Sequence, residues 1–247
     1  MASLPALEDT RAVSVGWEGA SVAPVPIDPP ARAVGLVRGR ADKSHYRRYG
    51  KRLADLIIAL SLIIMLSPLI ALAAIGALVT SGWPVFYGAE RVGRGGRRFR
   101  MWKIRTMVRD ADAALRLWTD ENPNLANAYA VDFKLRDDPR VTRFGRSLRR
   151  TSIDELPQLW NVLRGEMSLV GPRPVTEAEI RRYGKNSRTL LSLRPGMSGR
   201  WQLDARNQVT YPERMRIELE YCRAPSLARD LRILVCTLIV PFQSSGI

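Results

Sequence analysis

The longest apolar stretch of the chain runs from Leu56 to Val79, 24 residues without a charged side chain. As one straight helix it would measure about 36 Å, enough to cross a hydrocarbon core of about 30 Å. Ser67-Pro68 divides it into two apolar arms, Leu56–Leu66 and Leu69–Val79. Proline lacks a backbone N–H and crowds the preceding turn, so a kink is expected there. The pattern alone permits either a kinked spanning helix or a helix–break–helix that returns to one membrane face.

Basic side chains distinguish these two topologies, because they flank the apolar stretch at both ends. Before it come Arg38, Arg40, Lys43, Arg47, Arg48, Lys51 and Arg52, and after it come Arg91, Arg94, Arg97, Arg98, Arg100, Lys103, Arg105 and Arg109. Basic flanks remain on the cytoplasmic side of a membrane. A hairpin that enters and leaves by the cytoplasmic face satisfies both flanks, whereas a spanning helix satisfies one. We therefore predict a re-entrant membrane helix with its break at Ser67 and Pro68.

Beyond this segment, shorter patterns predict a β-hairpin followed by helices. Pro84–Tyr87 and Arg98–Arg105 read as strands, joined through the glycine-rich residues 93–96. Helical spacing or capping signals then predict helices at Met107–Trp118, Thr176–Tyr183 and Pro212–Arg223, and a last helix capped by Ser226. The apolar end of that last helix is too short to span a membrane, so we expect it to pack or to lie at the interface.

These elements predict an α+β fold, mainly helical, in three parts. Residues 1–42 are rich in proline without sustained periodicity, and we expect a disordered cytosolic tail. Residues 43–82 hold the basic flank and the re-entrant membrane helix. Residues 83–247 form the predicted cytoplasmic catalytic domain, with a small β-hairpin and interfacial amphipathic helices.

Composition limits the partners and the catalytic groups that we expect for this chain. Lys and Arg number 39 against 24 Asp and Glu, a formal net charge of +15, which favours an anionic partner such as nucleic acid, an anionic membrane or a phosphorylated substrate. The two cysteines and the single His45 argue against a disulfide scaffold, a zinc site and a Ser-His or Cys-His triad. Carboxylates, cations and a hard metal remain as the expected catalytic groups.

Two adjacent acids, Asp154 and Glu155, follow a run of arginines: Arg143, Arg146, Arg149 and Arg150. Residues 152–155 fit a capping box, in which Ser152 caps a helix and Glu155 reaches back, although Pro157 would then fall inside that helix. The same acids suit a nucleophile toward phosphorus and a Mg²⁺ ligand, because neighbours at a helix start point about 100° apart. Fixed cations must meet the charge of a transferred phosphoryl group, and the candidates are Lys103, Arg149 and Arg173. The residues alone leave both interpretations open.

From about Lys51 to the C-terminus, ordered motifs resemble those of bacterial sugar transferases, the monotopic phosphoglycosyl transferases that prime exopolysaccharide and glycan synthesis. The motifs are Lys51-Arg52 with Asp55, Ser67-Pro68, Arg91-Val92-Gly93, Lys103 to Met107, Asp138 to Thr142, Asp154 to Leu159, Gly165 to Ser168 and Gly171 to Pro174. In its short form, without the extra spanning helices of longer relatives, the sequence is similar to the galactose-type, exopolysaccharide-priming members. One departure is Asp204-Ala205-Arg206, where the family often has a Ser-Gly-Arg-like triplet, and it bears on sugar or nucleotide specificity.

The resemblance implies transfer of sugar-1-phosphate from a UDP-sugar to undecaprenyl (polyprenyl) phosphate, with release of UMP, at the cytoplasmic face of the inner membrane. It implies that Asp154 is the nucleophile of a phosphosugar–enzyme intermediate and that Glu155 binds Mg²⁺. Lys103, Arg149 and Arg173 match basic positions that bind phosphate or complete the site. Ser67-Pro68 match the break of the re-entrant helix.

Two other functions stay open at this level. A non-catalytic membrane scaffold of a polysaccharide assembly complex fits the membrane segment. Nucleic-acid binding would rest on net charge alone, since no recognition motif supports it, and we expect none. The sequence leaves open which sugar is transferred, what the tail does and whether the chain forms a homo-oligomer.

Overall fold

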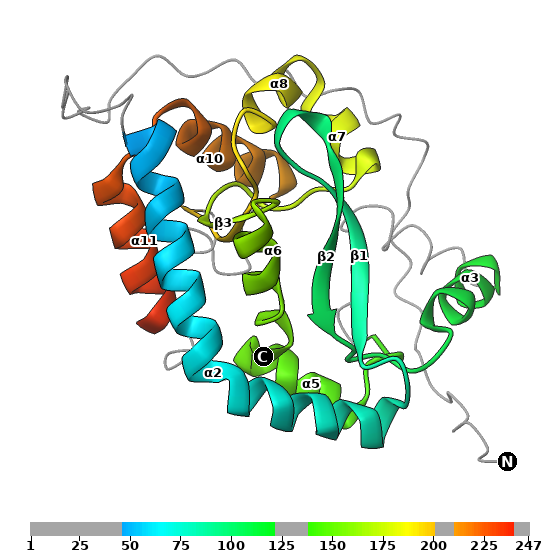
Figure 1. The fold of residues 1–247 in the computed structure, drawn as a ribbon. Helices are drawn as coiled ribbons and strands as arrows, with labels where there is room; N and C mark the ends of the chain where they lie inside the picture. Colours follow the sequence, from blue (N-terminus) through cyan, green and yellow to red (C-terminus); the bar gives the residue numbers. More distant parts are fainter. Residues whose placement is uncertain (1–45, 122–137, 201–209, 240–247) are drawn as a thin grey trace, which may run out of the picture.

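The computed structural model describes residues 46–121, 138–200 and 210–239, and it is mostly helical with two small strand pairs (Figure 1). This architecture confirms the α+β prediction. The predicted tail, residues 1–42, and the departure at Asp204-Ala205-Arg206 lie outside the described residues.

The apolar stretch forms helix α2, Lys51–Ser81, preceded by a π-helical turn at Tyr46–Gly50. The helix runs down one side of the molecule and then turns along its lower edge (Figure 1). Pro68 lies inside α2, and the Ser67 hydroxyl donates to the Ile64 carbonyl at 3.0 Å, which partly replaces the backbone bond that proline cannot make. The predicted break is therefore a bend in a continuous helix, because the chain keeps helical geometry on both sides of Pro68.

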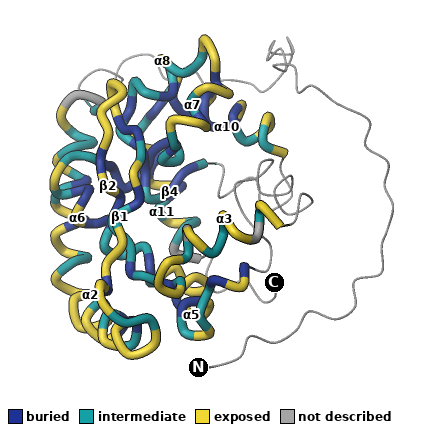
Figure 2. Tube along the Cα trace, turned by 90° about the vertical axis from the view of Figure 1, so that its right-hand side faces the viewer, coloured by how far each residue is buried: buried dark blue, intermediate teal, exposed yellow. Residues whose placement is uncertain are grey.

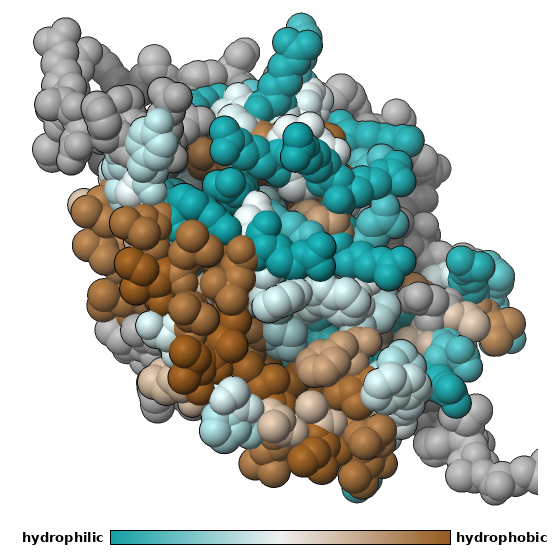
Figure 3. All heavy atoms as spheres, in the orientation of Figure 1, coloured by the Kyte–Doolittle hydropathy of each residue, from teal (hydrophilic) through white to brown (hydrophobic). Residues whose placement is uncertain are grey.

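Helix α2 leaves most of its apolar side chains exposed. Leu53, Ile57, Leu60, Ile64, Met65, Leu69, Leu72, Ile75, Leu78 and Val79 are all exposed. They form much of the hydrophobic surface over both arms of the helix (Figure 3). Among the described residues, α2 is the one helix long and apolar enough to cross a membrane by length and composition.

The predicted hairpin is present, although its first strand begins two residues later than the predicted Pro84–Tyr87 and continues five residues beyond Tyr87. Strands β1, Phe86–Val92, and β2, Arg98–Ile104, pair antiparallel, with Tyr87 opposite Lys103. A 3₁₀ turn at Arg94–Gly96 joins them, where Gly95 and Gly96 take positive φ angles that favour glycine. A second pair, β3 (Ser168–Val170) and β4 (Gly196–Ser198), is parallel and was not predicted.

The remaining helices are α3 (Ala111–Glu121), α5 (Arg143–Thr151), α6 (Gln158–Arg164), α7 (Glu177–Tyr183), α8 (Ser187–Leu190), α10 (Tyr211–Arg223) and α11 (Leu227–Ile239). The predictions for α7, α10 and α11 are confirmed, and Thr176 caps α7 through a capping box with Glu179. The helix predicted at Met107–Trp118 begins four residues later, because Met107 bridges to Val141 instead.

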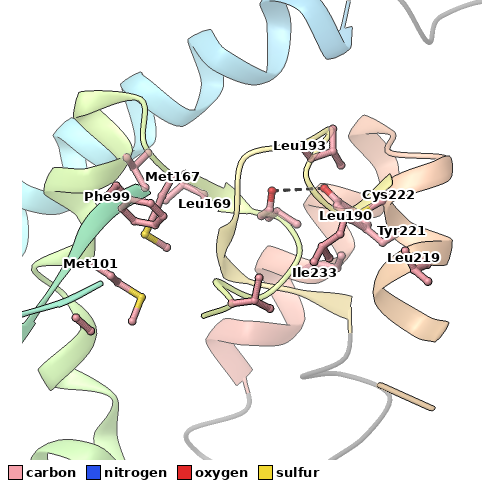
Figure 4. Close-up of a cluster of buried hydrophobic side chains, with 14 of the residues drawn as sticks. Phe99, Met101, Met167, Leu169, Leu190, Leu193, Leu219, Tyr221, Cys222 and Ile233 are labelled. Atoms are coloured by element: carbon pink, nitrogen blue, oxygen red, sulfur yellow. Dashed lines mark hydrogen bonds between the residues drawn. The ribbon is translucent and has the colours of Figure 1, made fainter. Parts of the chain in front are cut away.

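Helix α6 lies near the centre of the core, between α2 and the hairpin (Figure 1). Leu159 and Val162 are almost fully buried, in one cluster with Phe99 and Met101 of β2. Figure 4 shows how this cluster continues through Met167 and Leu169 toward Tyr221 of α10 and Ile233 of α11. The exposed surface of α2 contrasts with the buried inner faces of the hairpin and of α6 (Figure 2).

A buried polar contact ties α11 to the start of α2. Asp230 is 3% exposed, and its carboxylate accepts hydrogen bonds from Tyr46, Lys51 and Tyr221. Packing of α11 is therefore confirmed, although Leu227, Leu231 and Val235 face outward.

Candidate active site

The acidic pair lies in a tight turn between α5 and α6. Helix α5 ends at Ser152, whose φ of 57° is left-handed, and a 3₁₀ turn at Ile153–Glu155 follows. The predicted capping box is wrong, because Ser152 ends α5 and its side chain makes no capping hydrogen bond. Pro157 immediately precedes α6 rather than interrupting it, since the helix begins only at Gln158. The turn thus presents Asp154 and Glu155 on a short, constrained segment.

Asp154 is a buried carboxylate, 5% exposed. Burial raises its pKa above the ordinary value, because a charged carboxylate is poorly solvated there. The positive charges of Lys103 and Arg149 act against this rise, whereas Glu155 adds to it. Asp154 therefore lies within electrostatic reach of Lys103, Arg149 and Glu155.

Glu155 and Lys103 form the direct contact of the site. Lys103 Nζ donates to Glu155 Oε1 at 2.6 Å, with the two side chains 27% and 35% exposed. Lys103 lies near the C-terminal end of β2, away from the hairpin turn and 52 positions before Glu155. The hairpin thus delivers a cation to the acidic turn, where a bound substrate can still reach both groups.

Arg149 approaches from α5 and belongs to a second polar network. Its Nε donates to Thr106 Oγ1 at 2.8 Å. Nearby, Arg140 and Asp138 are both buried and joined by hydrogen bonds from Arg140 Nε and Nη2. Burial raises the pKa of Asp138, but its bonds to Arg140 and the charges of Arg140 and Arg149 outweigh burial and hold it below the ordinary value. In the sequence, Asp138 and Arg140 appeared only within a motif of the family resemblance, so their pairing and the network around it were missed.

Arg173 takes a different position from the other predicted cations. It follows β3, which comes after α6 in the chain, whereas the acidic turn precedes α6. A hydrogen bond from the backbone of Arg173 and the positive charge of its side chain both lower the pKa of Glu218 on α10. Glu218 also accepts a hydrogen bond from the Tyr183 hydroxyl. Burial raises the pKa of Glu218 to about 6, although these partners act against it. The role of Arg173 in phosphate binding stays a prediction.

Helix α6 holds the acidic turn and the hairpin in fixed relation. Asn161 is fully buried, accepts from the Trp102 backbone N–H at 3.0 Å, and donates to the Arg100 carbonyl at 2.7 Å. Its amide therefore pairs with β2 as a neighbouring strand would. Sequence reasoning missed Asn161, because its partners lie about sixty positions away and local periodicity cannot indicate them.

The donor set is compatible with a divalent cation that the substrate helps to bind. Among the described residues, no group of three or more His, Cys, Asp or Glu side chains could hold a metal ion. Mg²⁺ commonly uses one or two carboxylates together with substrate phosphates and waters. Glu155 fits this role, since the contact with Lys103 uses Oε1 alone.

Comparisons with known proteins place these features in a family. A family model described as bacterial sugar transferase matches residues 46–244. The chain is 44% identical to the UDP-galactose-lipid carrier transferase of Erwinia amylovora over 82% of its length and 42% of that protein. It is 42% identical to the exopolysaccharide production protein ExoY of Sinorhizobium fredii over 79% of its length and 87% of that protein.

A third relative is the undecaprenyl-phosphate galactose phosphotransferase of Salmonella typhimurium. It is 39% identical over 81% of this chain and 42% of its own length. The chain thus spans less than half of two of these relatives and most of the other. Since the family model covers all the described residues, including the acidic turn, the hairpin and α2, this chain belongs to the bacterial sugar transferase family.

Proposed function

We propose that this chain transfers sugar-1-phosphate from a UDP-sugar to undecaprenyl phosphate and releases UMP, as the first step of exopolysaccharide or glycan synthesis. The observation that carries the proposal is the buried Asp154 beside the Lys103–Glu155 pair and Arg149. Relatives whose names describe lipid-carrier and undecaprenyl-phosphate transferases support the substrate class. The identity of the sugar is left to experiment.

The proposed reaction has two displacements at phosphorus. A carboxylate oxygen of Asp154 attacks the phosphorus that bears the sugar, and the bond from that phosphorus to the UMP oxygen breaks, so UMP leaves. A phosphate oxygen of the lipid then attacks the same phosphorus, and the Asp154 carboxylate leaves. The products are UMP and a lipid diphosphate sugar, and Asp154 returns to its initial state.

The neighbouring side chains have separate tasks in this scheme. Lys103 and Arg149 favour the charged form of Asp154 and provide fixed positive charge beside the transferred phosphoryl group. Glu155, held by Lys103, would bind Mg²⁺. When bound, that ion would neutralise charge on the nucleotide phosphates. We extend the phosphate-binding role to Arg173 from its position in the Gly171–Pro174 motif.

Helix α2 supports a membrane-associated location for this chemistry. Its exposed apolar arms form one surface, and α11 lies alongside the first arm with Leu227 and Leu231 outward (Figures 1 and 3). Burying these side chains in lipid is favourable, at about 25 cal/mol per Å² of apolar surface. We propose that α2 is re-entrant at its bend and keeps the catalytic part on the cytoplasmic face of the inner membrane.

Cysteine labelling tests this topology. Glu90 lies on β1 beyond the end of α2, and its side chain is 67% exposed. In Glu90→Cys, an impermeant maleimide should label the chain in permeabilised cells and leave it unlabelled in intact cells. The unaltered chain, with Cys222 and Cys236, sets the background. Labelling from outside intact cells would show that α2 spans the membrane.

Turnover tests the proposed activity. The chain, purified in detergent, should release UMP from one or a few members of a UDP-sugar panel when undecaprenyl phosphate is present. Without the lipid, the reaction should stop at the covalent phosphosugar–enzyme intermediate, so UMP release should not be sustained. Chelation with EDTA should abolish release, and Mg²⁺ should restore it. Absence of UMP release with every UDP-sugar would contradict the proposal and favour the non-catalytic membrane scaffold.

A further inference from the structure

Three arginines from distant segments meet at the C-terminal end of α6, the end opposite the acidic turn. Arg52, in the first turn of α2, donates from Nη1 to the Val162 carbonyl at 2.6 Å and from Nη2 to the Leu163 carbonyl at 2.9 Å. Arg194 Nε donates to the Gly165 carbonyl at 2.8 Å. A Cβ on Gly165 would lie 3.3 Å from Arg52 Nη2, so both guanidinium groups border this glycine.

Arg94 joins the two from the tip of the hairpin. The backbone N–H of Gly95 donates to the Leu191 carbonyl at 2.8 Å, which holds the hairpin turn against the loop that carries Arg194. Burial lowers the pKa of Arg194, and the charges of Arg52 and Arg94 lower it further, while Asp55 acts in the opposite direction. The guanidinium groups of Arg52 and Arg94 are therefore each close enough to Arg194 to repel its charge.

The protein leaves much of this positive charge uncompensated. Within residues 46–121, 138–200 and 210–239, none of the three forms an ion pair with a carboxylate. The end of a helix supplies about half of one negative charge. Asp55 accepts the Leu169 backbone N–H, and Glu166 is engaged with Asn161 and Arg164. Even if Asp55 offsets one of the three charges, an excess of more than one remains.

We infer that Arg52, Arg94 and Arg194 form a second anion site, which binds the phosphate of a phosphate ester outside the catalytic turn. Arg suits this ligand, because its planar donors match phosphate oxygens. Arg52 lies in the first turn of α2, so the favoured source of the phosphate is the headgroup of an anionic phospholipid beside the point where α2 enters the membrane. This inference rests on the proposed membrane location and needs no turnover.

Lipid binding to two double variants tests the site. Arg94→Gln/Arg194→Gln removes two charges of the cluster and leaves Arg52, which anchors α6, in place. The control Arg97→Gln/Arg100→Gln removes the same charge from exposed hairpin positions. Full chains in neutral detergent are titrated with dioctanoyl-phosphatidylglycerol, and separately with inorganic phosphate and with UMP. The cluster variant should bind the lipid about tenfold more weakly than wild type, and the control should match wild type.

The outcomes separate the site from the proposed activity. Weakened phosphate binding in the cluster variant, with unchanged lipid binding, would support the anion site and assign it to a soluble phosphate. Equal binding of all three probes to both double variants would overturn the inference. Asp154→Asn should bind the lipid as wild type does, so an inactive enzyme would leave this result standing.

Discussion

Asp154→Asn should reduce UMP release by at least about 10³-fold, because an amide cannot perform the attack on phosphorus. The substitution keeps the size of a side chain that is 5% exposed, so the fold should be retained. It also removes the negative charge that Lys103 and Arg149 face. The measurement is UMP release with undecaprenyl phosphate, together with trapping of radioactive sugar phosphate on the denatured protein.

Asp120→Asn is the matched control, because Asp120 is an exposed carboxylate on α3. It should retain both UMP release and the trapped label. Full activity in Asp154→Asn would exclude Asp154 as the nucleophile. Loss of sustained UMP release with a retained covalent label would show that another side chain carries the sugar phosphate, and would limit Asp154 to the second displacement.

Gly145→Ala should cause the largest loss of stability among single-methyl additions in α5. A Cβ at Gly145 would lie 2.1 Å from the Thr106 carbonyl oxygen, which is backbone and cannot move aside as a side chain can. Overpacking of this kind costs about 3 kcal/mol, which corresponds to roughly 10 °C in Tm for a chain of this size. A thermal melt in detergent measures the change.

Ser147→Ala serves as the control, because Ser147 is exposed on the same helix. Its Tm should stay close to that of wild type. At temperatures below the melting range, Gly145→Ala should also be less active than wild type, because displacing α5 separates Arg149 from Thr106. An unchanged Tm in Gly145→Ala would show that α5 does not rest against Thr106.

Local pattern was sufficient for much of the fold. The uninterrupted apolar stretch predicted α2, and a proline within it predicted the bend. The glycine-rich turn predicted the hairpin, and Thr176 with Glu179 satisfied the capping rules for α7. These signals work because the groups that determine each element lie within a few residues of one another.

The candidate site was predictable only in part, because its geometry depends on distant contacts. The acidic pair and the charge of Lys103 are visible in the sequence, but their 2.6 Å contact joins segments 52 positions apart. No local signal marked Asn161, and Asp138 and Arg140 appeared only within a motif of the family resemblance. The failed capping box shows the converse error, since a valid local signal lost to the need to end α5 at Ser152.

The two arms of α2 bear on different sides of the acidic turn. The first arm holds α6 through Arg52, while Gly76 of the second arm leaves room for Phe144 of α5. The turn that carries Asp154 joins α5 to α6, so the start of α2 acts on this turn through the length of α6, and the second arm acts on it through α5. A bilayer that opened or closed the bend would move α5 and α6 relative to one another. Turnover should therefore respond to acyl-chain length, with the membrane acting as a mechanical part of the enzyme.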